Sequence, residues 1–119
     1  MKTIFVVDDS DTNLAMAEEA LEDHYSVMTL PSAAKMFSLL EKMTPELILL
    51  DIEMPEMNGF EALERLRVNN SWVNIPVLFL TGTTDASIEE RSYKLGAVGI
   101  VTKPFSAPML LDRIKMYVK

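Results

Sequence analysis

Short apolar runs alternate with longer amphipathic segments along the whole chain. The runs lie near residues 3–8, 25–30, 46–51, 76–81 and 97–102. Between the first two runs, Leu14, Ala17 and Leu21 are spaced to share one face of a helix. Alternation of this kind is typical of βα units that build a parallel sheet. The sequence therefore predicts an α/β fold with five strands, each followed by a helix.

The later helices show the same periodicity and clear start signals. Their predicted inner faces are Ala33, Phe37 and Leu40, then Phe60, Leu63 and Leu66, then Ile88 and Leu95, and finally Leu110, Ile114 and Tyr117. Asn58 followed by Glu61 predicts a capping box at the third helix. Asp85 and Ser106 are placed to cap the last two helices.

The second apolar run differs from the others. Residues 25–30 alternate apolar and polar side chains, as an edge strand does, whereas residues 4–7 are continuously apolar, as in a strand covered on both faces. An edge position for the second strand gives the order 2-1-3-4-5, and right-handed crossovers then put helices on both faces. This doubly wound, flavodoxin-like arrangement has a crevice at the carboxyl ends of strands one and three.

Ionisable residues stand at the ends of several predicted strands. Asp8 and Asp9 follow the first run, Asp51 ends the third, and Lys103 follows the fifth. Clustered carboxylates repel one another, and a hard divalent cation relieves that repulsion. Few oxygen ligands leave room for water and phosphate oxygens, which suits Mg²⁺ better than Ca²⁺. The sequence predicts a magnesium site at this edge, with Lys103 and the Thr81 hydroxyl beside it.

Asp51 is the predicted nucleophile of this site. It stands alone at its strand end, between the acidic pair and Lys103. A carboxylate can attack phosphorus to form an acyl phosphate, and a metal with a lysine opposite stabilises the charge that develops. The loop after it contains Pro55 and Gly59, which fit a fixed turn whose backbone faces the metal.

Bulk composition limits the other function classes. The 119 residues fit one domain, 1–119, and a net charge of -7 disfavours direct nucleic-acid binding. The absence of cysteine and the single histidine, His24, exclude thiolate and multi-histidine metal sites. The first apolar run is too short for a signal-peptide core or a membrane span, so we expect a cytoplasmic protein without membrane contact.

Taken together, the motifs make the sequence resemble the receiver domain of two-component response regulators. The matching pieces extend over essentially the whole chain: Val7-Asp8-Asp9, Asp51 with Met54-Pro55 and Asn58-Gly59, Thr81-Gly82, Gly96-Ala97, and Thr102-Lys103-Pro104-Phe105.

The resemblance implies a set of site residues. These are Asp51 as phosphoacceptor; Asp8, Asp9, Asp51 and the backbone carbonyl of Glu53 as Mg²⁺ ligands; and Thr81, Gly82 and Lys103 as contacts of the phosphoryl group. It also implies a cis bond between Lys103 and Pro104, which X-Pro chemistry permits at modest cost.

The resemblance further implies partners and an output. The phosphoryl group would come from a histidine kinase, a phosphotransfer protein or a small phosphodonor, and the chain would modify itself rather than turn over a substrate. Phosphorylation would draw Thr81 inward and change the face formed by the fourth helix, fifth strand and fifth helix. That face would signal to a downstream protein or output domain, and it is a candidate homodimer contact.

The sequence departs from the family pattern at four positions. Ile100 stands at the switch position, where receivers often have Tyr or Phe, so the usual coupling of hydroxyl movement to an aromatic rotamer cannot operate in its standard form. Glu53 and Thr83 occupy positions that tune phosphoryl lifetime in the family. Gly82 replaces a common alanine, which could loosen the loop after Thr81.

Two alternative functions stay open at this level. Asp9-Ser10-Asp11 after an apolar strand is similar to the motif of haloacid-dehalogenase-type phosphohydrolases, although Asn13 stands where that family has Thr or Val. Asp51 would then have no purpose. The second alternative, motivated by Ile100, is a docking domain that works without phosphorylation.

Overall fold

A computed structural model describes residues 1–83 and 85–119, and in this part of the chain five strands alternate with five helices. The elements are β1 (Thr3–Val7), α1 (Asp11–Leu21), β2 (Ser26–Leu30), α2 (Ala33–Leu40), β3 (Leu47–Asp51), α3 (Gly59–Arg67), β4 (Val77–Thr81), α4 (Ala86–Lys94), β5 (Gly99–Thr102) and α5 (Ala107–Lys115). The βα alternation predicted from the sequence is confirmed. The largest difference lies at β5, which begins at Gly99 instead of residue 97.

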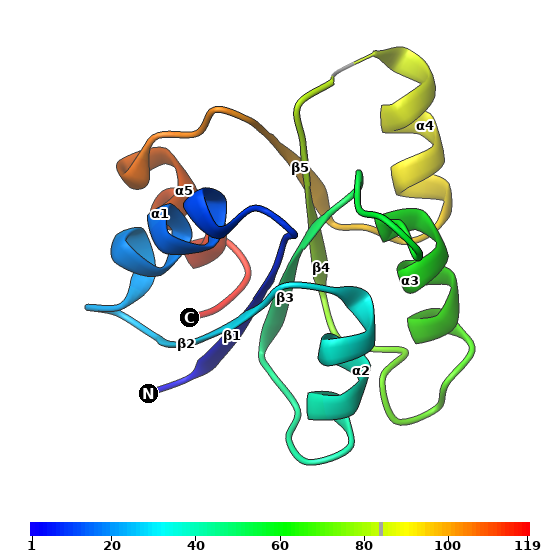
Figure 1. The fold of residues 1–119 in the computed structure, drawn as a ribbon, viewed down its shortest axis with the longest axis horizontal. Helices are drawn as coiled ribbons and strands as arrows, with labels where there is room; N and C mark the ends of the chain where they lie inside the picture. Colours follow the sequence, from blue (N-terminus) through cyan, green and yellow to red (C-terminus); the bar gives the residue numbers. More distant parts are fainter. Residues whose placement is uncertain (84) are drawn as a thin grey trace.

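The strands form one parallel sheet in the order β2-β1-β3-β4-β5, as predicted. Helices α1 and α5 cover one face of the sheet, and α2, α3 and α4 cover the other (Figure 1). The edge strand β2 is only partly buried, whereas every residue of β3 and β4 is buried. The polar alternation in the second run therefore did mark the edge of the sheet.

Each face of the sheet packs its own apolar core. Because strand side chains alternate between faces, Ile4 and Val6 point to the α1/α5 side, while Phe5 and Val7 point to the α2/α3/α4 side. Phe60 of α3 meets Phe79 of β4 edge to face, with the ring centroids 5.5 Å apart. The sheet thus separates two packing layers, one on each of its faces.

Side-chain caps fix the starts of the helices where the sequence placed them. The Asn58 side chain accepts from the Glu61 backbone N–H at 2.9 Å, and the Glu61 carboxylate accepts from the Asn58 N–H at 3.0 Å. Asp85 caps α4 through the Ile88 N–H, and Ser106 caps α5 in the same way. These bonds satisfy backbone donors that a helix start otherwise leaves unpaired.

The inner face of α2 differs from the predicted one. Met36 is fully buried beside Ala33 and Leu40, whereas Phe37 is only half-buried. Phe37 packs instead against Trp72, with ring centroids 5.5 Å apart. The smaller, unbranched methionine fits against the sheet itself.

The predicted inner face of α4 is less buried than the faces of the other helices. Ile88 and Leu95 are half-buried, and Ser92 is the buried residue of this helix. Beyond α5, which ends at Lys115, the Tyr117 hydroxyl donates to the Val98 carbonyl at 3.1 Å. Among the described residues, no helix has the length and apolar character needed to cross a membrane.

Gly59 brings the first turn of α3 directly against the end of β3. Its N–H donates to the Ile52 carbonyl at 2.8 Å. A β-carbon at this position would lie 2.5 Å from the backbone oxygen of Asp51 and 2.8 Å from Cα of Ile52. A backbone atom cannot yield as a flexible side chain can, so the position admits only glycine without a shift of the strand end.

We expect Gly59→Ala to lower the free energy of unfolding by about 1–3 kcal/mol, the usual cost of overpacking. Urea denaturation followed by circular dichroism measures it. Gly82→Ala is the matched control, because a β-carbon there meets nothing within 4 Å; its effect should stay below about 0.5 kcal/mol. Equal losses in both variants would contradict the close approach as the cause.

Candidate functional site

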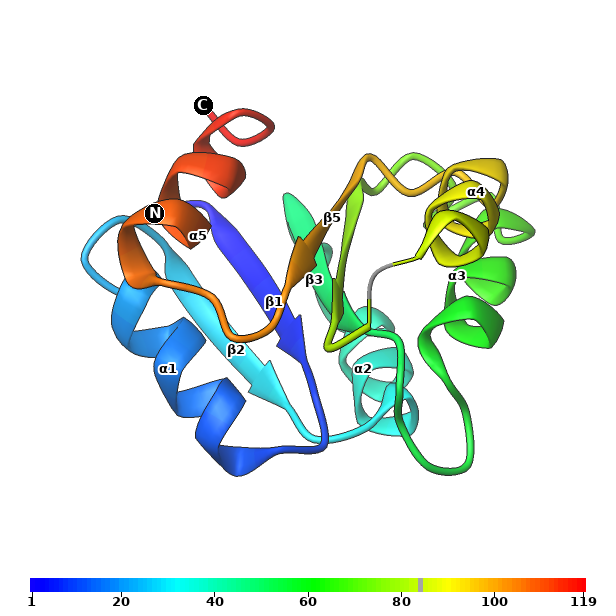
Figure 2. The same ribbon diagram turned by 90° about the horizontal axis from the view of Figure 1, so that it is seen from above.

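The predicted site residues converge at the carboxyl edge of the sheet. Asp8 directly follows β1, Asp51 and Thr81 are the last residues of β3 and β4, and Lys103 directly follows β5. The parallel register pairs Asp51 with Leu80 and Thr81 with Thr102, so these strand ends lie level with one another. The connections that leave β1, β3 and β5 accordingly emerge on the same side of the molecule (Figure 2).

Three carboxylates form the acidic part of the site. One oxygen each from Asp8, Asp9 and Asp51 lies within 4.8 Å of the others. Asp8 and Asp51 are buried, at 0% and 1% exposure, whereas Asp9 is exposed. Opposite them, Lys103 Nζ lies 2.9 Å from Asp51 Oδ1 and 3.3 Å from Asp8 Oδ2. The structure therefore brings together the four charged residues that the sequence placed at strand ends.

The start of α1 holds the Asp8 carboxylate in place. Its Oδ1 accepts from the Ser10 backbone N–H at 2.9 Å, and its Oδ2 accepts from Asn13 Nδ2 at 3.2 Å. Ser10 also caps α1 by accepting from the Asn13 N–H at 3.3 Å. This supporting role of Asn13 was not among the sequence-based predictions. Its position in the first turn after the acidic pair is the signal that could have indicated one.

Burial dominates the electrostatics of Asp51. Loss of solvent raises the pKa of the Asp51 carboxyl from 3.8 to about 7; pairing with Lys103 opposes the rise, and the charges of Asp8 and Glu53 add to it. Partial burial works against the charge of the Lys103 ammonium, but pairing with Asp51 and Asp8 outweighs this, so the pKa of Lys103 is raised. The two carboxylates thus stabilise the charged form of Lys103. The negative charge of Asp51, in contrast, is only partly compensated by the lysine.

The donor set of the acidic cluster fits a hard divalent ion. Although Lys103 is close to Asp51 Oδ1, no group in residues 1–83 and 85–119 makes an aligned hydrogen bond to this buried oxygen. Buried polar atoms normally have partners, so this oxygen is suited to accept a cation. Carboxylate oxygens in small number, without nitrogen or sulfur, match the ligand preference of Mg²⁺.

Thr81 makes a contact that the sequence did not predict. Its hydroxyl is buried and lies 2.7 Å from Glu53 Oε1, while the Thr83 carbonyl lies 3.0 Å away. The Thr83 N–H donates back to the same hydroxyl at 3.1 Å. The Glu53 residue is exposed, but its carboxylate reaches across from the loop after β3 to the end of β4.

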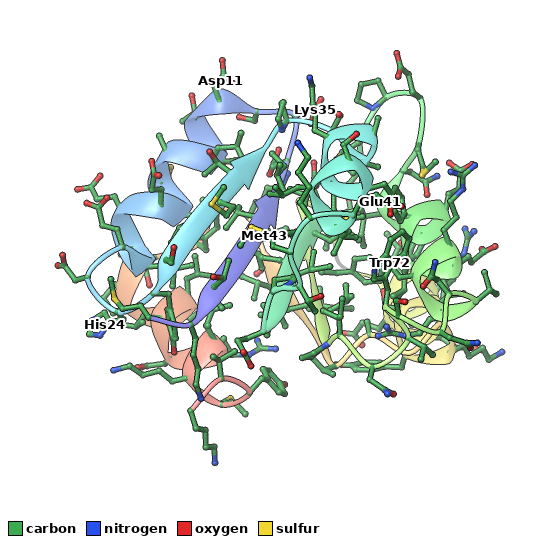
Figure 3. The ribbon with its side chains drawn as sticks, turned by 90° about the horizontal axis from the view of Figure 1, so that it is seen from below. Asp11, His24, Lys35, Glu41, Met43 and Trp72 are labelled. Atoms are coloured by element: carbon green, nitrogen blue, oxygen red, sulfur yellow. The ribbon has the colours of Figure 1, made fainter. Side chains whose placement is uncertain are left out.

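The remaining residues of interest surround this centre. The Lys103–Pro104 peptide bond is cis. Ile100 is half-buried against the α2/α3/α4 core, and its carbonyl accepts from Arg113 Nη1 at 3.1 Å. His24 lies at the far end of the molecule from Asp11, which begins α1 beside the acidic cluster, so the histidine takes no part in the site (Figure 3).

The family of the chain follows from comparison with known proteins. Residues 4–115 match the response regulator receiver domain. The chain belongs to this family. The match agrees with the strand order and with the acidic cluster at the carboxyl edge of the sheet.

Individual receiver proteins cover the chain almost completely. Polar-differentiation response regulator DivK of Brucella ovis is 29% identical over 98% of this chain and 95% of its own length. The crystallised chemotaxis protein CheY4 of Vibrio cholerae superposes with a TM-score of 0.94 at 28% identity, covering 99% of both chains. A probable cyclic di-GMP phosphodiesterase of Vibrio cholerae is 37% identical over 98% of this chain, which spans only 26% of that protein.

Family membership bears on one of the two alternative functions that the sequence left open. Receiver domains are signalling domains, and in two-component systems they generally interact with kinases and downstream targets. The haloacid-dehalogenase alternative is wrong, because the match assigns residues 4–115 as a whole to the receiver family. The phosphodiesterase name belongs to a protein about four times as long as this chain, so it describes that protein only.

We expect the stability of the metal-free protein to fall as pH rises from about 4 to about 7. The folded Asp51 keeps its proton up to about pH 7, whereas the unfolded one loses it near 3.8, so folding binds protons in this window. Relative to wild type, the free energy of unfolding of Asp51→Asn should increase by on the order of 2 kcal/mol between pH 5 and pH 8.

Urea unfolding in the presence of a chelator measures this difference. Asp9→Asn is the matched control, since that carboxylate is exposed, and it should leave most of the pH dependence in place. An unchanged pH dependence in Asp51→Asn would contradict burial of an under-compensated carboxyl at this position.

Proposed function

We propose that residues 1–119 act as one receiver domain in which Asp51 accepts a phosphoryl group in a Mg²⁺-dependent reaction. The observation that carries this proposal is the buried Asp51 carboxylate, which lies between an acidic pair on one side and the Lys103 ammonium 2.9 Å away on the other. A carboxylate in these surroundings is placed to attack a phosphoryl group once a Mg²⁺ ion is bound beside it.

Asp8, Asp9, Asp51 and the backbone carbonyl of Glu53 would hold the Mg²⁺ ion. When bound, the ion neutralises charge on the phosphoryl oxygens and on the acids around them. The hydrogen bonds from Ser10 and Asn13 fix Asp8, so one ligand oxygen is oriented in advance. Support of this kind is usual for metal ligands.

In the proposed reaction an Asp51 carboxylate oxygen attacks phosphorus in line with the leaving group. The new P–O bond forms as the P–N bond of a phosphohistidine, or the P–O bond of a small phosphodonor, breaks and the leaving group takes the electron pair. Lys103 then pairs with a phosphoryl oxygen instead of the bare carboxylate. The Thr81 hydroxyl and the Gly82 backbone N–H supply the remaining donors.

The proposed output is a changed α4–β5–α5 face. Thr81 ends β4, and the loop after it leads directly into α4. Helix α4 is lightly anchored: Ser92 is buried, and the Arg91 guanidinium covers the Phe60 ring at 4.2 Å from its centroid. Inward movement of Thr81 would therefore act on the helix that has the fewest buried residues in the described part of the chain. Ile100 transmits it through packing rather than through an aromatic rotamer.

The proposed setting is a cytoplasmic two-component pathway. A histidine kinase or phosphotransfer protein supplies the phosphoryl group, and a downstream protein or output domain reads the α4–β5–α5 face, which is also the candidate homodimer contact. The net charge of -7 opposes direct nucleic-acid binding by this domain.

We expect acetyl phosphate with Mg²⁺ to add one phosphoryl group to the wild-type chain, because Asp51 is the carboxylate between the metal ligands and Lys103. Intact-mass spectrometry measures the gain, which should vanish with a chelator and in Asp51→Asn. Asp112→Asn, which changes an exposed acid on α5, should be labelled like wild type. Absence of labelling in all variants would favour phosphorylation-independent docking instead.

We also expect Mg²⁺ to stabilise the fold above pH 7, because the Asp51 carboxyl, with its pKa raised to about 7, has then lost its proton. A ligand at 100 times its dissociation constant contributes about 2.7 kcal/mol. Thermal unfolding with and without Mg²⁺ should show a rise in Tm that is largely lost in Asp8→Asn and Asp51→Asn and kept in Asp112→Asn. A rise of equal size in all four proteins would place the bound ion elsewhere.

A further inference from the structure

The Thr81 hydroxyl has one proton to donate, and in this structure it donates that proton in a hydrogen bond to the Glu53 carboxylate. Glu53 Oε1 lies 2.7 Å away, closer than the Thr83 carbonyl at 3.0 Å. The hydroxyl oxygen meanwhile accepts from the Thr83 N–H. A hydrogen bond to an ionised carboxylate is shorter and stronger than one to a neutral carbonyl. Glu53 is therefore the preferred acceptor for Thr81.

The backbone aligns the two residues for this bond. The Ile52 N–H donates to the Leu80 carbonyl at 2.9 Å, which extends the pairing of β3 with β4 one residue beyond Asp51. This pairing places Ile52 level with Thr81, and the side chain of the next residue, Glu53, reaches the Thr81 hydroxyl. The bond joins the loop after β3 to the last residue of β4, next to Asp51 at the carboxyl edge of the sheet.

A phosphoryl group on Asp51 would need the same proton. It is an anion, as is the Glu53 carboxylate, and one hydroxyl proton cannot serve both. Their like charges also disfavour close approach. The hydrogen bond to Glu53 must therefore break before Thr81 can donate to a phosphoryl oxygen.

We infer that the Glu53 side chain is a latch: it holds the Thr81 hydroxyl in the unphosphorylated state and competes with the phosphoryl group for its proton. This inference rests on the proposed function of Asp51. Glu53 acts through Thr81, so it is a positioning residue and not a catalytic one. The latch favours the resting state and raises the amount of phosphoryl donor needed to switch the domain.

Simple charge repulsion is the competing explanation for any effect of Glu53. Repulsion depends on the carboxylate charge alone and persists when Thr81 has no hydroxyl. The latch requires both partners, so removal of either one abolishes the contribution of the other. A double-mutant cycle between Glu53 and Thr81 separates the two explanations.

The test uses the full chain with Mg²⁺ and beryllofluoride, a mimic of the phosphoryl group, whose bound form is counted by fluorine NMR. Glu53→Ala should tighten beryllofluoride binding by about 3- to 10-fold, as expected for loss of one competing hydrogen bond to a charged group. The same change made in Thr81→Val should tighten binding by less than about 2-fold. Equal tightening in both backgrounds would overturn the latch and leave repulsion.

Conservative variants sharpen the result. Glu53→Gln removes the charge but keeps an acceptor for Thr81, so its affinity should lie between wild type and Glu53→Ala. Thr81→Ser keeps the hydroxyl and should retain the full effect of Glu53→Ala. Glu56→Gln removes a charge from the same exposed loop and should change the affinity by less than about 2-fold. Glu53→Gln binding as tightly as Glu53→Ala would count against the latch.

The outcomes distinguish this inference from the function on which it rests. If no variant binds beryllofluoride with Mg²⁺, the phosphoacceptor function fails, and the latch as a competitor fails with it. If wild type binds but the cycle shows no coupling, the function stands and the latch alone is wrong. Mg²⁺ affinity measured without beryllofluoride should be alike in wild type and Glu53→Ala, since the backbone carbonyl is unchanged.

Discussion

The structure depends on the meeting of like charges at one edge of a parallel sheet. Burial of Asp8 and Asp51 costs free energy, and the Lys103 ammonium compensates only part of it. The raised pKa of Asp51 reflects the part of this cost that the lysine does not offset. The fold thus keeps an acid in surroundings that favour either a proton, a metal ion or a covalent bond. A bound Mg²⁺ ion would relieve this unfavourable charge.

Much of this arrangement could be predicted from sequence because periodicity and strand ends carry the relevant information. Continuous apolar runs identify buried parallel strands, and alternation in residues 25–30 identifies the edge. Once the order is known, Asp8, Asp51 and Lys103 must share one edge. Their convergence therefore follows from topology, without knowledge of any side-chain contact.

Contacts between loops could not be predicted in this way. The Glu53–Thr81 hydrogen bond depends on how two loops leave adjacent strands, and no periodicity encodes that path. Burial of Met36, instead of the predicted Phe37, on the inner face of α2 has a similar origin. Both residues fit a helical stripe, and the choice depends on Trp72, a loop residue that covers Phe37 from outside. Tertiary packing decided each case.

The limited burial of α4 has a consequence for how the sequence of such a domain can evolve. Ser92 is its one buried residue in the described part of the chain, Ile88 and Leu95 pack half-buried against the core, and Arg91 lies over the Phe60 ring. Substitutions on its outer surface therefore cost the fold little stability. Changes on this surface would alter which partners the domain contacts, while the charged residues at the carboxyl edge of the sheet stay the same.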